Sequence, residues 1–148
     1  MEISPEIKEK MAKSILFAER TGIEVVDVSK GYAKLKMPIE GNGNHVNTMY
    51  AGALFTLAEL PGGIVYVSTF DRSRYYPIVK DMYIKFTRPA TTDVTIEIRL
   101  SDEEAQRITA DAEENGKADY ILEGELVDAN GTVVALSKGT YQLRKIGT

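Results

Sequence analysis

The chain has 148 residues, of which 43% are hydrophobic and 27% charged, and its formal net charge at pH 7 is −4. These values predict one soluble globular domain over residues 1–148, and they exclude a disordered chain. The negative charge argues against broad nucleic-acid binding, which depends on excess Lys and Arg. With no cysteine and one histidine, His45, the sequence excludes disulfides and thiolate chemistry and predicts no metal site and no Ser/His/Asp triad.

The first third of the chain predicts a helix followed by two strands. Ser4 and Pro5 are a helix-start signal, and apolar residues recur every four positions on the way to Gly22, so one helix is predicted up to that glycine. Residues 24–29 and 32–37 are β-branched or alternating runs separated by two residues, which predicts a hairpin. The charged N-terminal segment contains no apolar signal sequence, so a cytoplasmic location is expected.

The longest apolar segment covers residues 48–70 and contains a single charged residue, Glu59. Its length alone would be compatible with a membrane span. A carboxylate near the middle and a Pro-Gly-Gly sequence at residues 61–63 argue against a span and predict a buried central helix that is kinked or ends near the proline. A polar, glycine-rich loop, residues 40–47, leads directly into this helix, and the chemistry is expected at that junction.

The remainder of the chain predicts four strands with one surface helix inserted between them. Ser101 and Glu104 have capping-box spacing at the start of this helix, and Gly116 ends it. Consecutive hairpins predict an antiparallel sheet, and the central helix is apolar enough to cover the buried face of that sheet. The sequence therefore predicts an α+β fold in which the sheet wraps around the helix. The predicted strands cover residues 76–87, 92–101, 118–127 and 132–143.

Glu59 is the first candidate for chemistry. A carboxylate loses several kcal/mol of hydration on burial unless it is paired, hydrogen-bonded or protonated. We therefore favour a general base or nucleophile tuned by an apolar pocket over a side chain that reaches solvent or pairs with a basic residue. Ala51 and Gly52 fall in the first helical turn, where free backbone N–H groups can stabilise an oxyanion. Close packing of the helix start explains these two small residues equally well.

The spacing of Ala51 and Glu59 makes a prediction about assembly. Eight residues along one helix correspond to about 12 Å, too far for one substrate carbonyl to contact both. A carboxylate and an oxyanion donor that act on one carbonyl should therefore come from different chains. We expect a homodimer with two composite sites, or a homotetramer built from such dimers.

The sequence resembles a known family along nearly all of its length. The stretch NHVNTMYAGALFTLAE, which starts at Asn44, resembles the signature of hotdog-fold thioesterases of the PaaI-like group, in particular a DUF4442-like branch once labelled as acetyltransferases. The stretch KFTRPATTDVTI, which starts at Lys85, and the stretch GTYQLRK near the C-terminus extend the resemblance. It implies a hotdog fold and hydrolysis of acyl-CoA thioesters, with the coenzyme A thioester as substrate and no other cofactor.

The resemblance also implies roles for single residues. Glu59 matches the catalytic acidic residue, Ala51 the residue whose N–H polarises the thioester carbonyl, and Asn44 a polar residue beside the site. Tyr50 stands where a histidine followed by two glycines is usual, and Gly63 stands where some members carry a hydroxyl group. The residues expected to bind substrate are Asn47, Tyr50, Gly52, Gly63 and Arg88.

Several alternatives stay open at this point. The missing histidine at Tyr50 favours, as a second function, a non-catalytic protein that binds acyl-CoA or fatty acids. Hydration or dehydration of an acyl chain ranks third, because His45 lies in the loop before the helix. Arg88 and the basic residues preceding it could bind the phosphates of coenzyme A or an acidic carrier protein, and solvated surface charge is the other explanation. Asn44 fits a structural role in the loop as well as a functional one.

Overall fold

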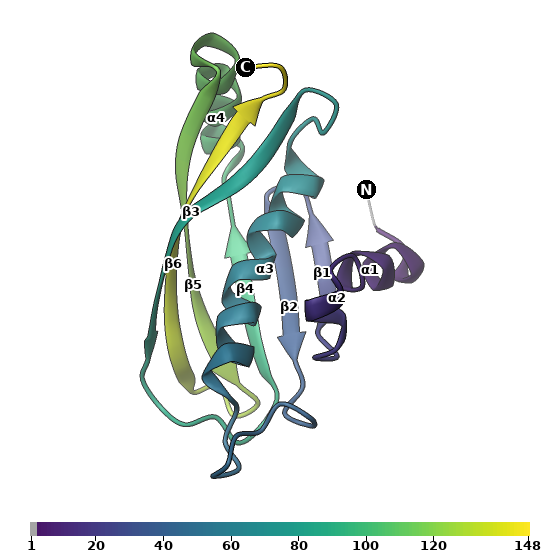
Figure 1. Cartoon of the computed structure of the whole chain (residues 1–148), viewed down its shortest axis with the longest axis vertical. Helices are drawn as coiled ribbons and strands as arrows, with labels where there is room; N and C mark the ends of the chain where they lie inside the picture. Colours follow the sequence, from purple (N-terminus) through teal and green to yellow (C-terminus); the bar gives the residue numbers. More distant parts are fainter. Residues whose placement is uncertain (1–2) are drawn as a thin grey trace.

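The structure is a computed structural model that describes residues 3–148, and its strands form one six-stranded antiparallel sheet in the order β1-β2-β4-β5-β6-β3. Helix α3 lies along one face of this sheet (Figure 1). The predicted α+β fold, a sheet wrapped around a long central helix, is confirmed. The elements are α1 (Pro5–Ala12), α2 (Leu16–Glu19), β1 (Glu24–Ser29), β2 (Tyr32–Met37), α3 (Ala51–Thr69), β3 (Tyr75–Phe86), β4 (Val94–Arg99), α4 (Asp102–Asn115), β5 (Lys117–Asp128) and β6 (Val133–Lys145).

Alternation of apolar and polar residues directs one face of the sheet onto α3. In β4, Val94, Ile96 and Ile98 are buried, whereas the residues between them lie on the outer face. Strand β2 pairs with β4 in a register that sets Leu35 opposite Ile96, so the buried residues of both strands point to the same side. The main core therefore lies between this face and α3, as the alternation predicts.

Helix α3 continues through Pro61 to Thr69, so the predicted end of the helix near the proline is wrong. A proline inside a helix removes one backbone hydrogen bond and costs about 3 kcal/mol. Each large apolar side chain that is fully buried contributes roughly 1.5–3 kcal/mol, and Leu57, Leu60, Ile64 and Val65 are buried on both sides of Pro61. Packing therefore outweighs the proline.

Within residues 3–148, α3 is the one helix long and apolar enough to cross a membrane, judged by length and composition alone. Half of its apolar window is buried inside the protein. Nine of its 19 residues are buried, so α3 is the central helix of the core. This confirms the prediction of a buried central helix.

The N-terminal segment forms two short helices, and the prediction of one helix up to Gly22 is wrong. The break falls at Ser14 and Ile15, where the Ser14 hydroxyl donates to the carbonyl of Met11 at 2.8 Å and Ile15 is extended, with φ −122° and ψ 118°. A serine that bonds to the local backbone competes with the helical pattern. Because of this break, Ile15 and Phe17 lie beside α3, while α1 packs against β1 (Figure 1).

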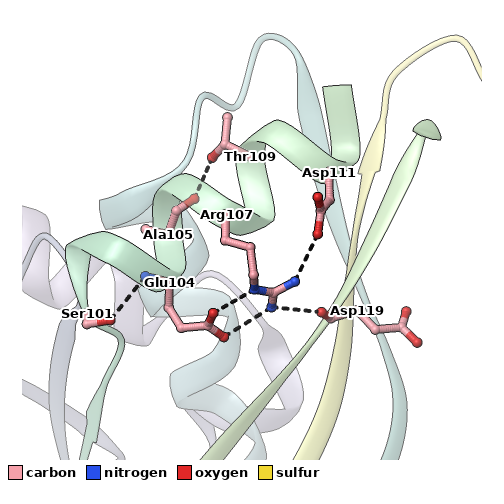
Figure 2. A network of polar contacts seen from close by, with 7 residues as sticks. All are labelled: Ser101, Glu104, Ala105, Arg107, Thr109, Asp111 and Asp119. Carbon is pink, nitrogen blue, oxygen red and sulfur yellow. Dashed lines mark hydrogen bonds and ion pairs between the residues drawn. The ribbon is translucent and has the colours of Figure 1, made fainter. Parts of the chain in front are cut away.

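Arg107 of helix α4 bonds to two acidic residues of its own helix and to strand β5 of the sheet (Figure 2). The Arg107 guanidinium donates to both carboxylate oxygens of Glu104 at 2.6 and 3.0 Å, to Asp111 at 3.0 Å, and to the backbone carbonyl of Asp119 in β5 at 3.3 Å. The predicted cap is confirmed, because the Ser101 hydroxyl accepts from the Glu104 amide at 3.1 Å. The buried face of this otherwise exposed helix consists of Ala105, Ile108 and Ala112.

Candidate active site on the central helix

The start of α3 is fixed by backbone hydrogen bonds from the preceding loop. The Met49 amide donates to the carbonyl of Ala90 and the Tyr50 amide to the carbonyl of Asn42, both at 2.8 Å. Ala51 is then the first helical residue. Among residues 3–148, the amides of Ala51 and Gly52 find no backbone acceptor, as expected for the first turn of a helix. Two free N–H groups therefore stand at the positive end of the helix dipole.

The Tyr50 ring lies directly over this turn. A Cβ atom added at Gly52 would overlap the ring, so a larger residue at this position would displace the ring from the helix start. Tyr50 remains 60% exposed, which leaves the ring accessible to a ligand at the helix start. The sequence Tyr-Ala-Gly therefore combines an aromatic ring with free backbone donors.

Glu59 lies on the same stripe of α3 as Gly52. The spacing Gly52, Thr56, Glu59 follows the helical repeat, so the three residues share one face. This face lines an open hollow of about 620 Å³ between α2, α3 and β3. The hollow is lined by Ile15, Phe17, Ala18, Gly52, Phe55, Thr56, Glu59, Leu60, Val79, Lys80, Asp81 and Met82.

The Glu59 carboxyl is half-buried in this hollow, and burial raises its pKa above the ordinary value. No charged group and no hydrogen bond among residues 3–148 counteracts that effect. A carboxyl whose pKa rises toward neutrality is a stronger base once it is ionised. The structure thus places a half-buried carboxyl with a raised pKa on the helix whose first turn carries the free N–H groups.

Two parts of this hollow were not predicted from the sequence. The first is Thr56, which lies one helical turn before Glu59, and this i to i+3 spacing was the signal in the sequence that could have identified it. The Thr56 hydroxyl donates to the carbonyl of Gly52 at 2.8 Å. The other part is a β-bulge in β3 between Val79 and Asp81, where the Asp81 carboxylate accepts from the Thr140 amide at 3.1 Å. Bulges bend strands next to functional sites, but no turn residue marks this one in the sequence.

The predicted loop residues hold the loop together. The Asn44 side-chain oxygen accepts from the amides of Val46 and Thr48 at 3.0 and 3.1 Å, and its amide group donates to the Thr48 hydroxyl at 2.9 Å. Asn47 has φ 63°, a left-handed conformation that asparagine tolerates. Neither residue lines the hollow around Glu59, so one chain does not bring Asn44, Ala51 and Glu59 together.

The other predicted substrate-binding residues, Gly63 and Arg88, do not line the hollow around Glu59. Gly63 lines a second hollow of about 530 Å³ between α1 and α3, which shares Ile15 and Leu60 with the first. The two hollows lie next to each other along α3, and we refer to them together as the trough. Arg88 lies in the loop after β3, where its amide donates to the carbonyl of Val134 at 3.2 Å, and its exposed side chain lines neither hollow.

A third hollow, of about 640 Å³, lies on the outer face of the sheet. Its charged side chains include two ion pairs, Arg99 with Glu97 at 3.2 Å and Lys138 with Glu123 at 3.9 Å. Paired, exposed charges of this kind do not create a reactive group. Residues 3–148 also contain no cluster of three or more His, Asp or Glu side chains able to hold a metal ion.

Comparison with models of protein families identifies the family of the chain. A family model described as "Domain of unknown function (DUF4442)" matches residues 8–143. The chain belongs to the DUF4442 family. This DUF4442 protein is similar to PA5026 from Pseudomonas aeruginosa, a protein of unknown function named a probable thioesterase, with 46% identity over 98% of each chain and a TM-score of 0.93. A comparison with curated protein sequences finds no match.

More distant solved structures share the fold of the DUF4442 protein. Thioesterase HI1161 from Haemophilus influenzae has 13% identity and a TM-score of 0.76, with 100% of this chain and 95% of that chain covered. A mutant of thioesterase PA1618 from Pseudomonas aeruginosa has 16% identity and a TM-score of 0.77, with 99% and 97% covered. The DUF4442 protein therefore has the hotdog fold, and the resemblance to a DUF4442-like branch of hotdog-fold proteins is confirmed.

Proposed function

We propose that this DUF4442 protein hydrolyses acyl thioesters, with coenzyme A thioesters as substrates. One observation carries the proposal: a half-buried carboxyl with a raised pKa, Glu59, lies in an apolar trough on the helix whose first turn has free N–H groups. A thioester needs both a base for water and a donor for the oxyanion. The name of PA5026, a probable thioesterase at 46% identity, supports the same reaction class.

In the proposed reaction the ionised Glu59 carboxylate takes a proton from a water molecule. The water oxygen attacks the thioester carbon, and the resulting oxyanion accepts a hydrogen bond from the Ala51 amide. The intermediate collapses with cleavage of the C–S bond. The thiolate takes the proton back from Glu59, and the products are a free acid and a thiol.

The two groups act from different chains in this proposal. Ala51 and Glu59 lie eight positions apart on one continuous helix, a separation of about 12 Å. The outer edge of β3 has no strand partner within residues 3–148, and this long edge exposes the apolar side chains of Ile78, Val79 and Tyr83. Long apolar edges pair with other strands. A second copy paired on β3 would lie next to the hollow, because Val79 belongs to the β3 edge and also lines the hollow.

The remaining predicted residues receive roles around this composite site. The loop with Asn44 and Asn47 leads into the turn that presents the Ala51 amide, so it would border the site of the neighbouring chain. Tyr50 and Gly52 would contact the thioester beside that amide, and Gly63 would line the acyl chain's path along α3. Outside the trough, the exposed Arg88 side chain would meet a phosphate of coenzyme A.

A hydrolysis screen tests the proposal. Short, medium, long and aromatic acyl-CoAs are offered to the wild type and to Glu59→Gln, and release of free thiol is recorded. We expect turnover of at least one class by the wild type, and a loss of about 10²–10⁴-fold in the variant, the usual contribution of a positioned general base. Equal turnover by both proteins would contradict the role of Glu59.

Non-catalytic binding of acyl-CoA is the second candidate function. The observation in its favour is the Tyr50 ring, which lies over the helix start and can cover the N–H groups that hydrolysis needs. Under this alternative the wild type binds acyl-CoA in titration calorimetry and releases no thiol. A Tyr50→His variant that gained hydrolysis would identify the ring as the cause.

A further inference from the structure

The turn of α3 that follows Glu59 is intrinsically weak. Pro61 has no N–H, so the carbonyl of Leu57 lacks its helical donor. Gly62 and Gly63 follow, and each glycine costs a helix about 1 kcal/mol relative to alanine. The residue proposed as the base therefore sits next to a turn in which its own helix holds the backbone weakly.

Tyr141 of β6 contacts α3 at this turn. Its side chain is buried, with 4% exposure, and its hydroxyl donates to the backbone carbonyl of Glu59 at 3.2 Å. The sulfur of Met82, which lines the hollow around Glu59, is 3.7 Å from the same hydroxyl. Residues 82 positions apart in sequence are thereby joined at the candidate site.

Two glycines make room for this contact. A Cβ atom added at Gly62 would lie 2.6 Å from the Tyr141 hydroxyl oxygen, and one added at Gly139 would lie 2.8 Å from the ring. Both distances are shorter than real Cβ contacts, so neither position accepts a side chain while Tyr141 keeps its place. One glycine comes from the helix and the other from β6, so both elements are shaped to admit the tyrosine.

We propose that Tyr141 is a positioning residue whose hydroxyl braces the turn of α3 that carries Glu59. This inference rests on the proposed function, because it assigns the brace to the carboxyl that would activate water. Burial and the neighbouring Glu59 carboxyl raise the pKa of Tyr141, which keeps the hydroxyl protonated and able to donate. Tyr141 does not line the trough, so it acts through Glu59 without touching substrate.

Tyr120 provides a matched control. Its ring stacks on that of Tyr141 with centroids 5.8 Å apart, and it is equally buried, with 2% exposure. Its hydroxyl has no hydrogen-bond partner among residues 3–148. Tyr120→Phe and Tyr141→Phe therefore each remove one oxygen from the same buried cluster, and only Tyr141→Phe removes a bond to α3.

The test measures amide hydrogen exchange at residues 59, 60, 62 and 63, together with kcat and KM, in the wild type and both variants. A hydrogen bond contributes about 0.5–1.5 kcal/mol, so Tyr141→Phe should speed exchange in this turn roughly two- to twelvefold and lower kcat by a similar factor. KM should stay unchanged in that variant. Tyr120→Phe should leave exchange, kcat and KM as in the wild type.

The outcomes separate this inference from the proposed function. Exchange of the amides in this turn that is unchanged in Tyr141→Phe, or raised equally in Tyr120→Phe, overturns the brace. Faster exchange with wild-type kcat overturns the positioning role. A wild type that hydrolyses no thioester overturns the proposed function, while exchange still decides whether Tyr141 braces the turn.

Discussion

Replacing Ala51 by proline removes the backbone N–H of this residue and is expected to change little else. Proline is favoured at the first helical position, where the N–H has no helical acceptor, and Ala51 occupies that position. The preceding residue must avoid the α region, and Tyr50 already has φ −59° and ψ 137°. The Ala51 amide makes no backbone hydrogen bond within residues 3–148. The substitution is therefore compatible with the fold and specific for the proposed oxyanion donor.

The expected effect is large on catalysis and small on stability. Loss of one oxyanion-hole donor lowers kcat by about 10²–10³-fold, equivalent to roughly 2.7–4 kcal/mol of transition-state stabilisation. The free energy of unfolding should change by less than about 0.5 kcal/mol, because no bond or packing contact is lost. The assay is thiol release with the best acyl-CoA of the screen, together with a thermal melt. Ala51→Ser retains the N–H and serves as the control.

A folded Ala51→Pro protein with less than about a tenfold loss in kcat would refute the reasoning, because a tenfold change corresponds to only about 1.4 kcal/mol. Loss of activity in both Ala51→Pro and Ala51→Ser would also contradict it. In that case the methyl group of Ala51, and not its amide, would be the feature that matters. A rise in KM alone would show that the amide binds substrate and transition state equally.

Three further predictions follow from the site. Because burial raises the pKa of Glu59, the acid limb of the kcat/KM profile should lie at a pH above 4.5, the ordinary glutamate pKa. In thermal melts, Glu59→Gln should be more stable than the wild type near pH 8, and the difference should vanish at low pH. Gly63→Val fits open space, so the protein should fold while hydrolysis of long acyl-CoAs falls and that of short ones persists in the same thiol assay. In light scattering, the wild type should have twice the 16.4 kDa mass of one chain. Tyr83→Lys on the β3 edge should shift the measured mass toward that of a single chain.

The sign of the pH effect on stability follows from the direction of the shift. A carboxyl whose pKa is higher in the folded than in the unfolded protein binds protons more readily when folded. Its ionisation therefore opposes folding as pH rises from the unfolded value through the folded value. The amide in Glu59→Gln never ionises, so the variant keeps at high pH the stability that the wild type has only when Glu59 is protonated. Equal melting temperatures near pH 8 would contradict the burial-induced shift.

The sequence predicted the fold where its patterns are local and strong. The strict alternation in β4 and the long apolar run around Glu59 identified the sheet face and the central helix, because burial of one face imposes a period of two on a strand. The capping spacing of Ser101 and Glu104 predicted the start of α4 correctly for the same local reason. The first residue of the candidate site, Ala51, was also found in this way, since free N–H groups are a property of every helix start.

Other features depend on contacts between distant segments, and the sequence could not show them. The break at Ser14 and the continuation of α3 through Pro61 are both decided by packing that outweighs local preference. The contact of Tyr141 with Glu59 joins β6 to α3. Its only trace in the sequence is a pair of glycines, Gly62 and Gly139, that lie inside a helix and a strand and not in turns. The bulge after Val79 is likewise a property of the β3 and β6 pair. The side walls of the site are thus tertiary features.

Mixing two inactive variants distinguishes a composite site from a site within one chain. In a symmetric dimer with Glu59 from one chain and the Ala51 amide from the other, a heterodimer of Glu59→Gln and Ala51→Pro has one site with both defects and one intact site. Random reassociation of equal amounts would restore roughly a quarter of the wild-type activity, since half of the dimers are mixed and half of their sites are intact. If both groups acted from the same chain, each site would keep one defect and mixing would restore nothing. Recovery therefore requires that the two ends of this stretch of α3, about 12 Å apart in one chain, meet across the interface.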